Sequence, residues 1–391
     1  MSLLKPPKLV ASTGTTYNCT VAETSARELS VQKWSGLGNP HESNLFKSAQ
    51  WSPDGTCVLS NSEDNILRTF VLPVDLLDPS DAPKSLTPYS QTASAEPVSC
   101  LAIYPSMSLA DPATCCFLKS TRDHPIHLHD LLVSNTRASY PLINPQTEKY
   151  LSPQSMLFTP KDANKFIAGA TSQISFFDLQ RPGEGPYLDL KTIPTRRSVQ
   201  TGETMKGVVS ALAIDNGVLA AGTLSRQVGL YDDCGSGSTI GVFTVDGEGG
   251  GITQLLWSKC GRYLHVVERK SDVISVYDVR VAGEKVESLE GRMAQTNQRI
   301  GVDIAYSLEG EVVSGGIGGM VSVWGTGGKG EKGFEWKAHD DVVSGVAIHP
   351  GGVVMATCSG TRKLSSLGED SDDDESSEER KWDNGLMIWA I

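Results

Sequence analysis

Apolar and polar residues alternate along many short stretches of this chain. The period is two, as in Ile174–Asp178 and Val321–Trp324, and a period of two predicts β-strands rather than helices. We find no amphipathic pattern with helical spacing that extends beyond about three turns. The pattern therefore predicts an all-β protein.

Two sequence elements recur along the chain. The first is an apolar pair followed closely by a turn, as in Ala49–Gly55, and the second is an alternating strand that ends in a ring side chain. Anchor residues of the first element, 42 to 56 residues apart, are Trp51, Ile103, Phe158, Ile214, Trp257, Tyr306 and Ile348. The rings of the second element are Phe70, His129, Phe177, Tyr231, Tyr277, Trp324 and Trp389. Seven copies in register predict a seven-bladed WD40-type β-propeller rather than an ordinary two-sheet β protein.

The last copy ends before its blade is complete. Trp389–Ile391 corresponds to a third strand, so an N-terminal segment must supply the fourth strand and cover the open edge. Glu28–Trp34 alternates correctly and is the predicted closing strand. On this hypothesis residues 1–27 form an N-terminal extension, and residues 28–391 form a single propeller.

The seventh copy also contains an insert, at about residues 362–383. It carries eight acidic residues between Glu369 and Glu379, whereas the whole chain has 34 basic and 46 acidic residues and a net charge of −12. A segment so acidic and so poor in apolar groups is predicted to be disordered. Without Glu369–Glu379 the net charge is only −4, which argues against unspecific binding of polyanions. We call the face that carries the loops before first strands and between second and third strands the top face; the insert is predicted to project from it.

Signals for catalysis or metal binding are weak. His124, His127 and His129 resemble a metal cluster, but the last two occupy third-strand positions, where packing explains them. Gly325–Gly330 lacks the serine or threonine that follows the lysine of a phosphate-binding loop. We therefore expect no enzyme activity, no cofactor and no metal. Neither a membrane span nor a C-x-x-C pair is present, and scattered cysteines favour a reducing compartment.

Basic residues gather in the predicted top loops. This suggests a platform for single-stranded nucleic acid. The candidate RNA-binding residues are Lys47, Arg122, His124, Arg196, Arg197, Arg226, Arg269, Lys270, Gln298 and Arg299. Acids such as Glu63 and Glu268 lie among them, so a mixed solvated surface is the alternative. Similarly, Arg299 could contact phosphate or a base, or it could pair with Asp303 and only brace its blade.

Several segments resemble one family of WD-repeat proteins, the telomerase Cajal body proteins. The similar segments are Trp51–Arg68, Thr121–His127, Gly250–Thr253, Glu268–Asp272 and Thr296–Ile300, and together with the acidic insert they extend the resemblance over residues 28–391. The resemblance implies a fungal-type member of that family, a propeller that recognises a short box in a hairpin loop of small Cajal-body RNAs. It further implies delivery of that RNA, telomerase RNA included, to Cajal bodies.

The leading hypothesis is therefore a non-catalytic RNA-binding scaffold that assists ribonucleoprotein assembly or localisation. Its expected partners are a single-stranded loop of small nuclear RNA and ribonucleoprotein proteins, and we expect a monomer. The expected compartment is the nucleus, in Cajal bodies or nucleoplasm, with an additional cytoplasmic pool. The alternative is a protein–protein interaction scaffold, such as a splicing factor or substrate receptor, that does not bind RNA itself.

Overall fold

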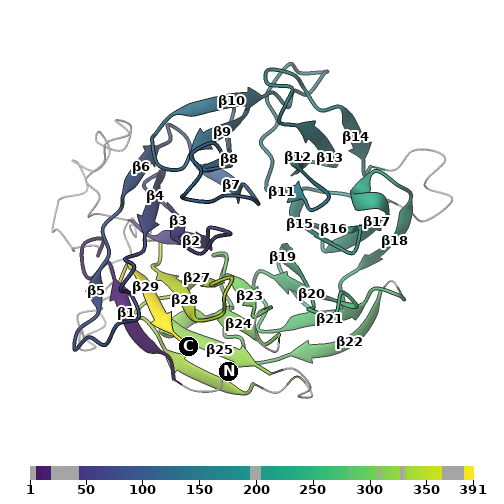
Figure 1. The fold of residues 1–391 in the computed structure, drawn as a ribbon. Helices are drawn as coiled ribbons and strands as arrows, with labels where there is room; N and C mark the ends of the chain where they lie inside the picture. Colours follow the sequence, from purple (N-terminus) through teal and green to yellow (C-terminus); the bar gives the residue numbers. More distant parts are fainter. Residues whose placement is uncertain are drawn as a thin grey trace, which may run out of the picture.

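Seven small β-sheets stand around a central channel like the blades of a propeller (Figure 1). The structure is a computed structural model that describes residues 6–18, 44–193, 204–281, 283–306, 310–325, 330, 332–362 and 383–391. Its helical elements in these ranges are two short 3-10 turns, η1 (Asp233–Gly235) and η2 (Ile317–Gly319). The seven-bladed all-β architecture predicted from the repeats is confirmed. None of the helices in the described ranges is long and apolar enough to cross a membrane.

Each blade is a four-stranded antiparallel sheet whose first strand lines the channel (Figure 1). The strands of blades one to four are β2 (Phe46–Trp51), β3 (Cys57–Ser62), β4 (Ile66–Val71) and β6 (Ser90–Ala93); β7 (Val98–Ile103), β8 (Cys116–Thr121), β9 (Ile126–Asp130) and β10 (Thr136–Tyr140); β11 (Ser155–Thr159), β12 (Asp162–Ala170), β13 (Gln173–Asp178) and β14 (Leu188–Lys191); and β15 (Val209–Asp215), β16 (Val218–Thr223), β17 (Gln227–Tyr231) and β18 (Thr239–Thr244). Those of blades five to seven are β19 (Ile252–Trp257), β20 (Tyr263–Glu268), β21 (Ile274–Asp278) and β22 (Glu284–Leu289); β23 (Val302–Ile304), β24 (Val312–Gly315), β25 (Met320–Trp324) and β26 (Phe334–Lys337); and β27 (Val343–Ile348), β28 (Val354–Ser359), β29 (Leu386–Ala390) and β1 (Lys8–Ser12), to which β5 (Lys84–Ser85) adds in parallel.

The apolar core lies between blades. Each pair of neighbouring blades shares one buried cluster, since alternate residues of every strand face opposite neighbours. The seven predicted rings all lie on third strands, and each is at most 9% exposed. Phe166 and Phe177, for example, stack with ring centroids 4.8 Å apart. Every blade therefore depends on both of its neighbours for burial.

The strand that closes the ring is β1, and the prediction of Glu28–Trp34 was wrong. Leu9 pairs with Trp389 and Ala11 pairs with Ile388 in an antiparallel ladder. In Figure 1 the purple N-terminal strand runs beside the yellow C-terminal one. An N-terminal segment does complete the last blade, but it comes from within the predicted extension. Residues 28–34 lie outside the described residues, as does the acidic stretch 363–382.

Sequence alternation did not select Lys8–Ser12, because Leu9, Val10 and Ala11 are three apolar residues in a row. The difference is made by partners far away in sequence. Ala11 is fully buried in the cluster between blades seven and one, and Leu9 packs against the cluster between blades six and seven. The closing strand is thus determined by its packing against the two apolar clusters on either side of blade seven.

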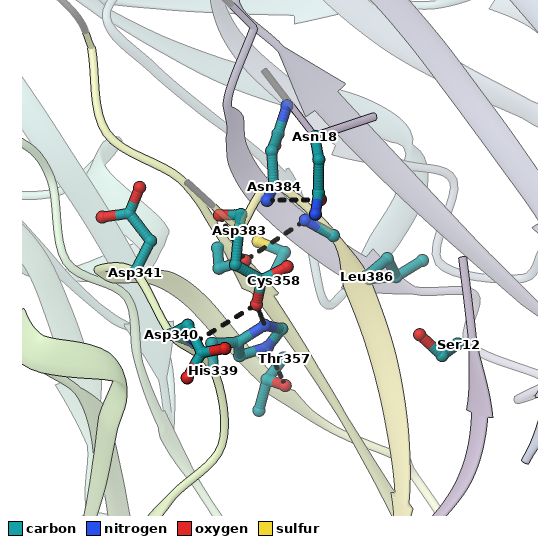
Figure 2. A network of polar contacts seen from close by, with 12 residues as sticks. Ser12, Asn18, His339, Asp340, Asp341, Thr357, Cys358, Asp383, Asn384 and Leu386 are labelled. Atoms are coloured by element: carbon teal, nitrogen blue, oxygen red, sulfur yellow. Dashed lines mark hydrogen bonds and ion pairs between the residues drawn. The ribbon is translucent and has the colours of Figure 1, made fainter. Parts of the chain in front are cut away.

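Asn384 ties the N-terminal segment to blades seven and one. Its side-chain Nδ2 donates to the carbonyl of Tyr17 at 2.8 Å, and its Oδ1 accepts from the amide of Phe46 at 3.0 Å. Its own amide donates to Oδ1 of Asn18 at 3.0 Å, a contact drawn in Figure 2. Tyr17 then packs edge-on against Phe46, with ring centroids 5.2 Å apart. One buried amide side chain therefore connects three segments at the joint.

A second buried network stands in the same blade. His339 Nδ1 donates to Asp383 Oδ2 at 3.1 Å, and His339 Nε2 lies 2.7 Å from Thr357 Oγ1 (Figure 2). Thr357 also accepts from Trp389 Nε1 at 2.8 Å. This chain of contacts links the loop before β27 to strands β28 and β29. The sequence analysis found Trp389 but not the other three members of the network.

We expect Asn384→Ala to lower the free energy of unfolding by about 2–4 kcal/mol. The change leaves the Phe46 amide and the Tyr17 carbonyl buried without their partner, at about 1–3 kcal/mol each. Denaturant unfolding of the variant measures the loss. The matched control is Gln146→Ala, which truncates an exposed amide side chain. Equal stability of both variants would contradict the role assigned to Asn384.

Asp383→Asn should destabilise the fold in a pH-dependent way. Burial alone would raise the pKa of Asp383, but hydrogen bonds from His339 and from the Asp340 amide bring this pKa below its ordinary value. A lowered folded-state pKa stabilises the protein above the unfolded value of about 4, and this stabilisation is lost as pH falls through the folded-state pKa.

At pH 7 the expected loss is about 1–3 kcal/mol, the range for a hydrogen bond to a charged group. The difference from the unsubstituted protein should narrow below about pH 4. Denaturant titrations at neutral and acidic pH measure both effects. Asp340→Asn, at an exposed aspartate in the loop before β27, is the control. A pH-independent difference would rule out the carboxylate as its source.

Candidate nucleic-acid interface

The predicted RNA-binding residues that the structure describes all belong to the top face. They lie in turns between second and third strands, in segments that precede first strands, or, for Lys47, at the start of a first strand. They come from blades one, two, four, five and six. Arg196 and Arg197 lie outside the described residues. The propeller topology thus gathers residues that are up to 252 positions apart in sequence, Lys47 and Arg299, on one face.

Three of these residues are exposed to solvent. They are Arg122 and His124 in the turn between β8 and β9, and Lys270 in the turn between β20 and β21. The side chain of Arg122 is 76% exposed and lies 3.6 Å from the similarly exposed carboxylate of Asp123. An ion pair so exposed to water contributes little to stability. His124 Nδ1 lies 2.7 Å from the carbonyl of Arg122. These side chains are the ones that a ligand could reach without displacing a partner from a short, shielded ion pair.

Two other cations are engaged in ion pairs. Lys47 Nζ lies 2.7 Å from Glu63, which also pairs with Arg362. Burial alone would raise the pKa of Glu63, but its hydrogen bonds with Lys47 and Arg362 lower this pKa below its ordinary value. Arg226 donates two bonds to Glu268, of 2.7 and 3.2 Å, and the Glu268 side chain is 5% exposed. At Lys47 and Arg226, therefore, the structure agrees with the alternative of a surface that mixes basic and acidic side chains.

Arg269 and Arg299 differ from the exposed Arg122 and Lys270 because their side chains are partly buried. Arg299 Nη2 donates to the carbonyl of Ser210, on the inner strand β15 of blade four, at 3.3 Å. Burial lowers the pKa of Arg299, and the charge of Arg269 lowers it further. Burial also lowers the pKa of Arg269. The Lys270 amide donates to the Thr296 carbonyl at 3.2 Å, so the loops that carry the two arginines lie side by side on the top face.

Asp303 does not pair with Arg299. Its carboxylate accepts from the amides of Ile304 at 2.8 Å and Ile348 at 2.7 Å. Burial raises its pKa to about 6. The alternative in which Arg299 pairs with Asp303 does not hold, because the carboxylate bonds to the amides of Ile304 and of Ile348 on the inner strand of the next blade instead.

Gln298 is held by the neighbouring blade. Its Nε2 donates to the carbonyl of Gly360 at 2.8 Å, and its amide donates to Oγ1 of Thr296 at 3.2 Å. Phe46, next to Lys47, is fully buried at the joint between blades seven and one and presents no ring to a base. His124, in contrast, has an exposed ring.

Arg292 is the residue at this site that the sequence analysis missed. It is 1% exposed, and its guanidinium donates to the carbonyls of Glu268 at 3.1 Å and Ile300 at 2.6 Å, and to Ser314 Oγ at 2.9 Å. Burial lowers its pKa to about 10, so it remains charged at neutral pH. Its position beside Thr296–Ile300 was visible in the sequence, but nothing in the pattern separated it from surface arginines.

The histidine cluster shows no sign of a metal site. His127 and His129 lie with ring centroids 5.7 Å apart, and His129 stacks on Phe117 at 5.8 Å. Burial lowers the pKa of His129 to about 4. Within the described ranges no group of three histidine, cysteine or acidic side chains is arranged to hold a metal ion. Packing accounts for these rings, as their third-strand positions predicted.

Comparison with known proteins adds independent information. A family model described as "WD domain, G-beta repeat" matches residues 330–365. The chain is 32% identical over 358 residues to guanine nucleotide-binding protein negative regulator 1 of Schizosaccharomyces pombe, covering 88% of each chain. It is 31% identical over 353 residues to human telomerase Cajal body protein 1, covering 88% of this chain and 61% of the human protein. The Drosophila melanogaster homolog is 29% identical, and the match covers 80% of this chain and 56% of that protein. The chain thus spans most of the fission yeast relative and about three fifths of these animal relatives.

Arg226→Ala should destabilise the fold by about 2–4 kcal/mol. The change leaves the Glu268 carboxylate buried without its partner, and breaking a shielded pair in this way costs more than the pair itself contributes. Thermal or denaturant unfolding measures the effect. Arg122→Ala, at an exposed arginine of the same face, is the control and should change stability by less than about 0.5 kcal/mol. If Arg226→Ala left the stability unchanged, Arg226 would be a surface cation that does not depend on its pair with Glu268.

Proposed function

The chain belongs to the WD-repeat family that includes the telomerase Cajal body proteins, and we propose that it is a scaffold that binds a single-stranded loop of small nuclear or Cajal-body RNA on its top face. In this proposal it assists the assembly or localisation of a ribonucleoprotein and acts as a monomer in the nucleus, in Cajal bodies or nucleoplasm. The names of the animal relatives, which refer to telomerase and Cajal bodies, support the choice of RNA and compartment.

One observation carries the proposal: two kinds of cation surround the channel mouth on the top face. Arg122 and Lys270 are exposed and can follow a flexible backbone. Arg269 and Arg299 are shielded and fixed, and neither has an ion pair within the described part of the chain. A surface that combines exposed cations with partly buried ones suits a single strand that lies across it, because phosphates dominate affinity for such ligands.

Base recognition would fall to other groups of the same face. His124 offers an exposed ring at one side of the face, and single-stranded bases stack on such rings. Gln298 already uses its amide nitrogen on Gly360, so its contribution to a base edge would come from its carbonyl oxygen. The fixed position of that amide favours selection of one base over another.

A second candidate comes from the fission yeast relative. Its name describes a negative regulator of a guanine nucleotide-binding protein, and the similarity covers 88% of both chains. That name favours a protein partner over RNA. On this reading the chain is a WD-repeat scaffold whose top face docks another protein.

Crosslinking of RNA to the protein in cells, followed by sequencing, separates the two candidates. Enrichment of small nuclear RNAs is the result expected from the first. Recovery of RNA at background, together with co-purification of a guanine nucleotide-binding protein, would replace it with the second.

The charge dependence gives a quantitative test in solution. We expect Arg122→Ala combined with Lys270→Ala to weaken binding of a short oligouridylate and to flatten its log–log salt dependence by about 0.7 for each phosphate that is no longer neutralised. The melting temperature should change little, since both side chains are exposed. The control is Lys161→Ala, an exposed lysine in the turn between β11 and β12, on the opposite face. Equal effects of the two sets of changes would remove the top face as the binding surface.

A further inference from the structure

Arg269 and Arg299 have hydrogen-bonding capacity that their surroundings do not use. The Nε atoms of both side chains are buried and have no hydrogen-bond partner within the described part of the chain. A guanidinium carries five N–H donors in a planar fork, and Arg299 uses Nη2 on the carbonyl of Ser210. Buried donors of this kind cost free energy unless an acceptor meets them.

The acidic groups on the neighbouring elements are engaged elsewhere. Glu268 pairs with Arg226 at 2.7 Å. Asp272 accepts from the amide of Ala294 at 2.5 Å, and Asp303 accepts from two backbone amides deeper in the channel. The other groups that face Arg299 are uncharged: Ser210, and Cys100, whose thiol pKa burial raises to about 12. Two like charges therefore meet in a shielded place with no carboxylate in contact among the described residues.

The two arginines are held in place by a third. Arg292 donates to the carbonyl of Glu268, the residue before Arg269, and to the carbonyl of Ile300, the residue after Arg299. The amide of Lys270 also donates to the carbonyl of Thr296 at 3.2 Å, and the amide of Arg292 donates to the carbonyl of Asp272 at 3.0 Å. These bonds join the turn between β20 and β21 to the loop before β23. The backbone segments that carry the two arginines thus keep their relative position without a ligand, which contributes to the preorganisation that a binding site needs.

We propose that Arg269 and Arg299 form a preorganised site for one phosphate group at the top mouth of the channel. Two planar forks can give more hydrogen bonds than one carboxylate accepts, whereas a phosphate presents several oxygens in a tetrahedral arrangement and up to two negative charges. The phosphate comes either from an RNA backbone or from a free phosphate ion. The RNA backbone as the source rests on the proposed function, whereas a site for a free phosphate ion does not.

The first experiment uses inorganic phosphate as the probe. The full chain is melted in buffers of equal ionic strength that contain sodium phosphate or sodium chloride, and phosphate binding is measured by calorimetry. Phosphate should raise the melting temperature of the unsubstituted protein and of the Arg181→Gln control, at an exposed arginine in the turn between β13 and β14 on the opposite face. In Arg299→Gln and Arg269→Gln its affinity should fall about tenfold or more, the loss expected for a hydrogen bond between charged groups.

The chloride buffer separates a binding role from a structural one. Arg299→Gln should melt at or above the temperature of the unsubstituted protein there, because it removes one of two neighbouring like charges and keeps a donor for Ser210. A purely structural arginine would instead lower the melting temperature equally in both buffers, and that result would overturn the proposal. So would stabilisation by phosphate that Arg299→Gln and Arg269→Gln leave unchanged.

Competition with a short oligouridylate identifies the source of the phosphate. If phosphate competes with the RNA and Arg299→Gln weakens both, the RNA backbone supplies the group. If phosphate binds through Arg299 without affecting RNA, the site takes a free ion. If RNA fails to bind but phosphate still does, the proposed function fails and the site stands. If RNA binds but phosphate shows no dependence on Arg299, the site is overturned while the proposed function survives.

Discussion

The hydrogen bonds between β1 and β29 join residues that are nearly the whole chain apart, and the other blade interfaces depend on them. Every blade buries its two faces only against neighbours, so an open ring would leave apolar faces and a strand edge exposed to water. Asn384 reinforces the joint because its side chain bonds both the N-terminal segment and the first strand of blade one. Closure in this protein is therefore a matter of a few buried polar bonds added to one strand pairing.

A closed ring fixes the positions of the top loops. It therefore also decides which cations of the top face pair with a carboxylate and which remain exposed. Arg226 and Lys47 belong to ion pairs with Glu268 and Glu63 and serve mainly to brace their blades. Arg122 and Lys270 remain exposed. Basic residues on one face thus either form ion pairs or remain available to a ligand. The outcome depends on whether the fold brings a carboxylate within hydrogen-bonding distance.

The channel mouth is organised in a third way. Arg292, Arg269 and Arg299 are all largely buried, and burial lowers the pKa of each, which means that the fold carries a cost for keeping them charged. Arg292 recovers part of that cost through bonds to carbonyl oxygens. The buried Nε atoms of the other two are not satisfied within the described residues. Buried donors without a partner cost stability, and the proposed phosphate site would supply the acceptor that they lack.

Sequence periodicity determined the fold of this chain: seven copies of one strand-and-ring pattern specify seven blades, because each copy can bury its apolar faces only by standing beside another. The pattern also placed the basic residues on one face, since loop position in a repeat follows from strand order alone. The tertiary structure decided what depends on partners distant in sequence. It made Lys8–Ser12 the closing strand, although only Glu28–Trp34 showed the expected alternation, because Leu9 and Ala11 pack against the two blade clusters on either side of β29. It also separated Arg299 from Asp303 and brought it beside Arg269 and Ser210, because contacts across a channel join residues whose spacing along the chain carries no signal.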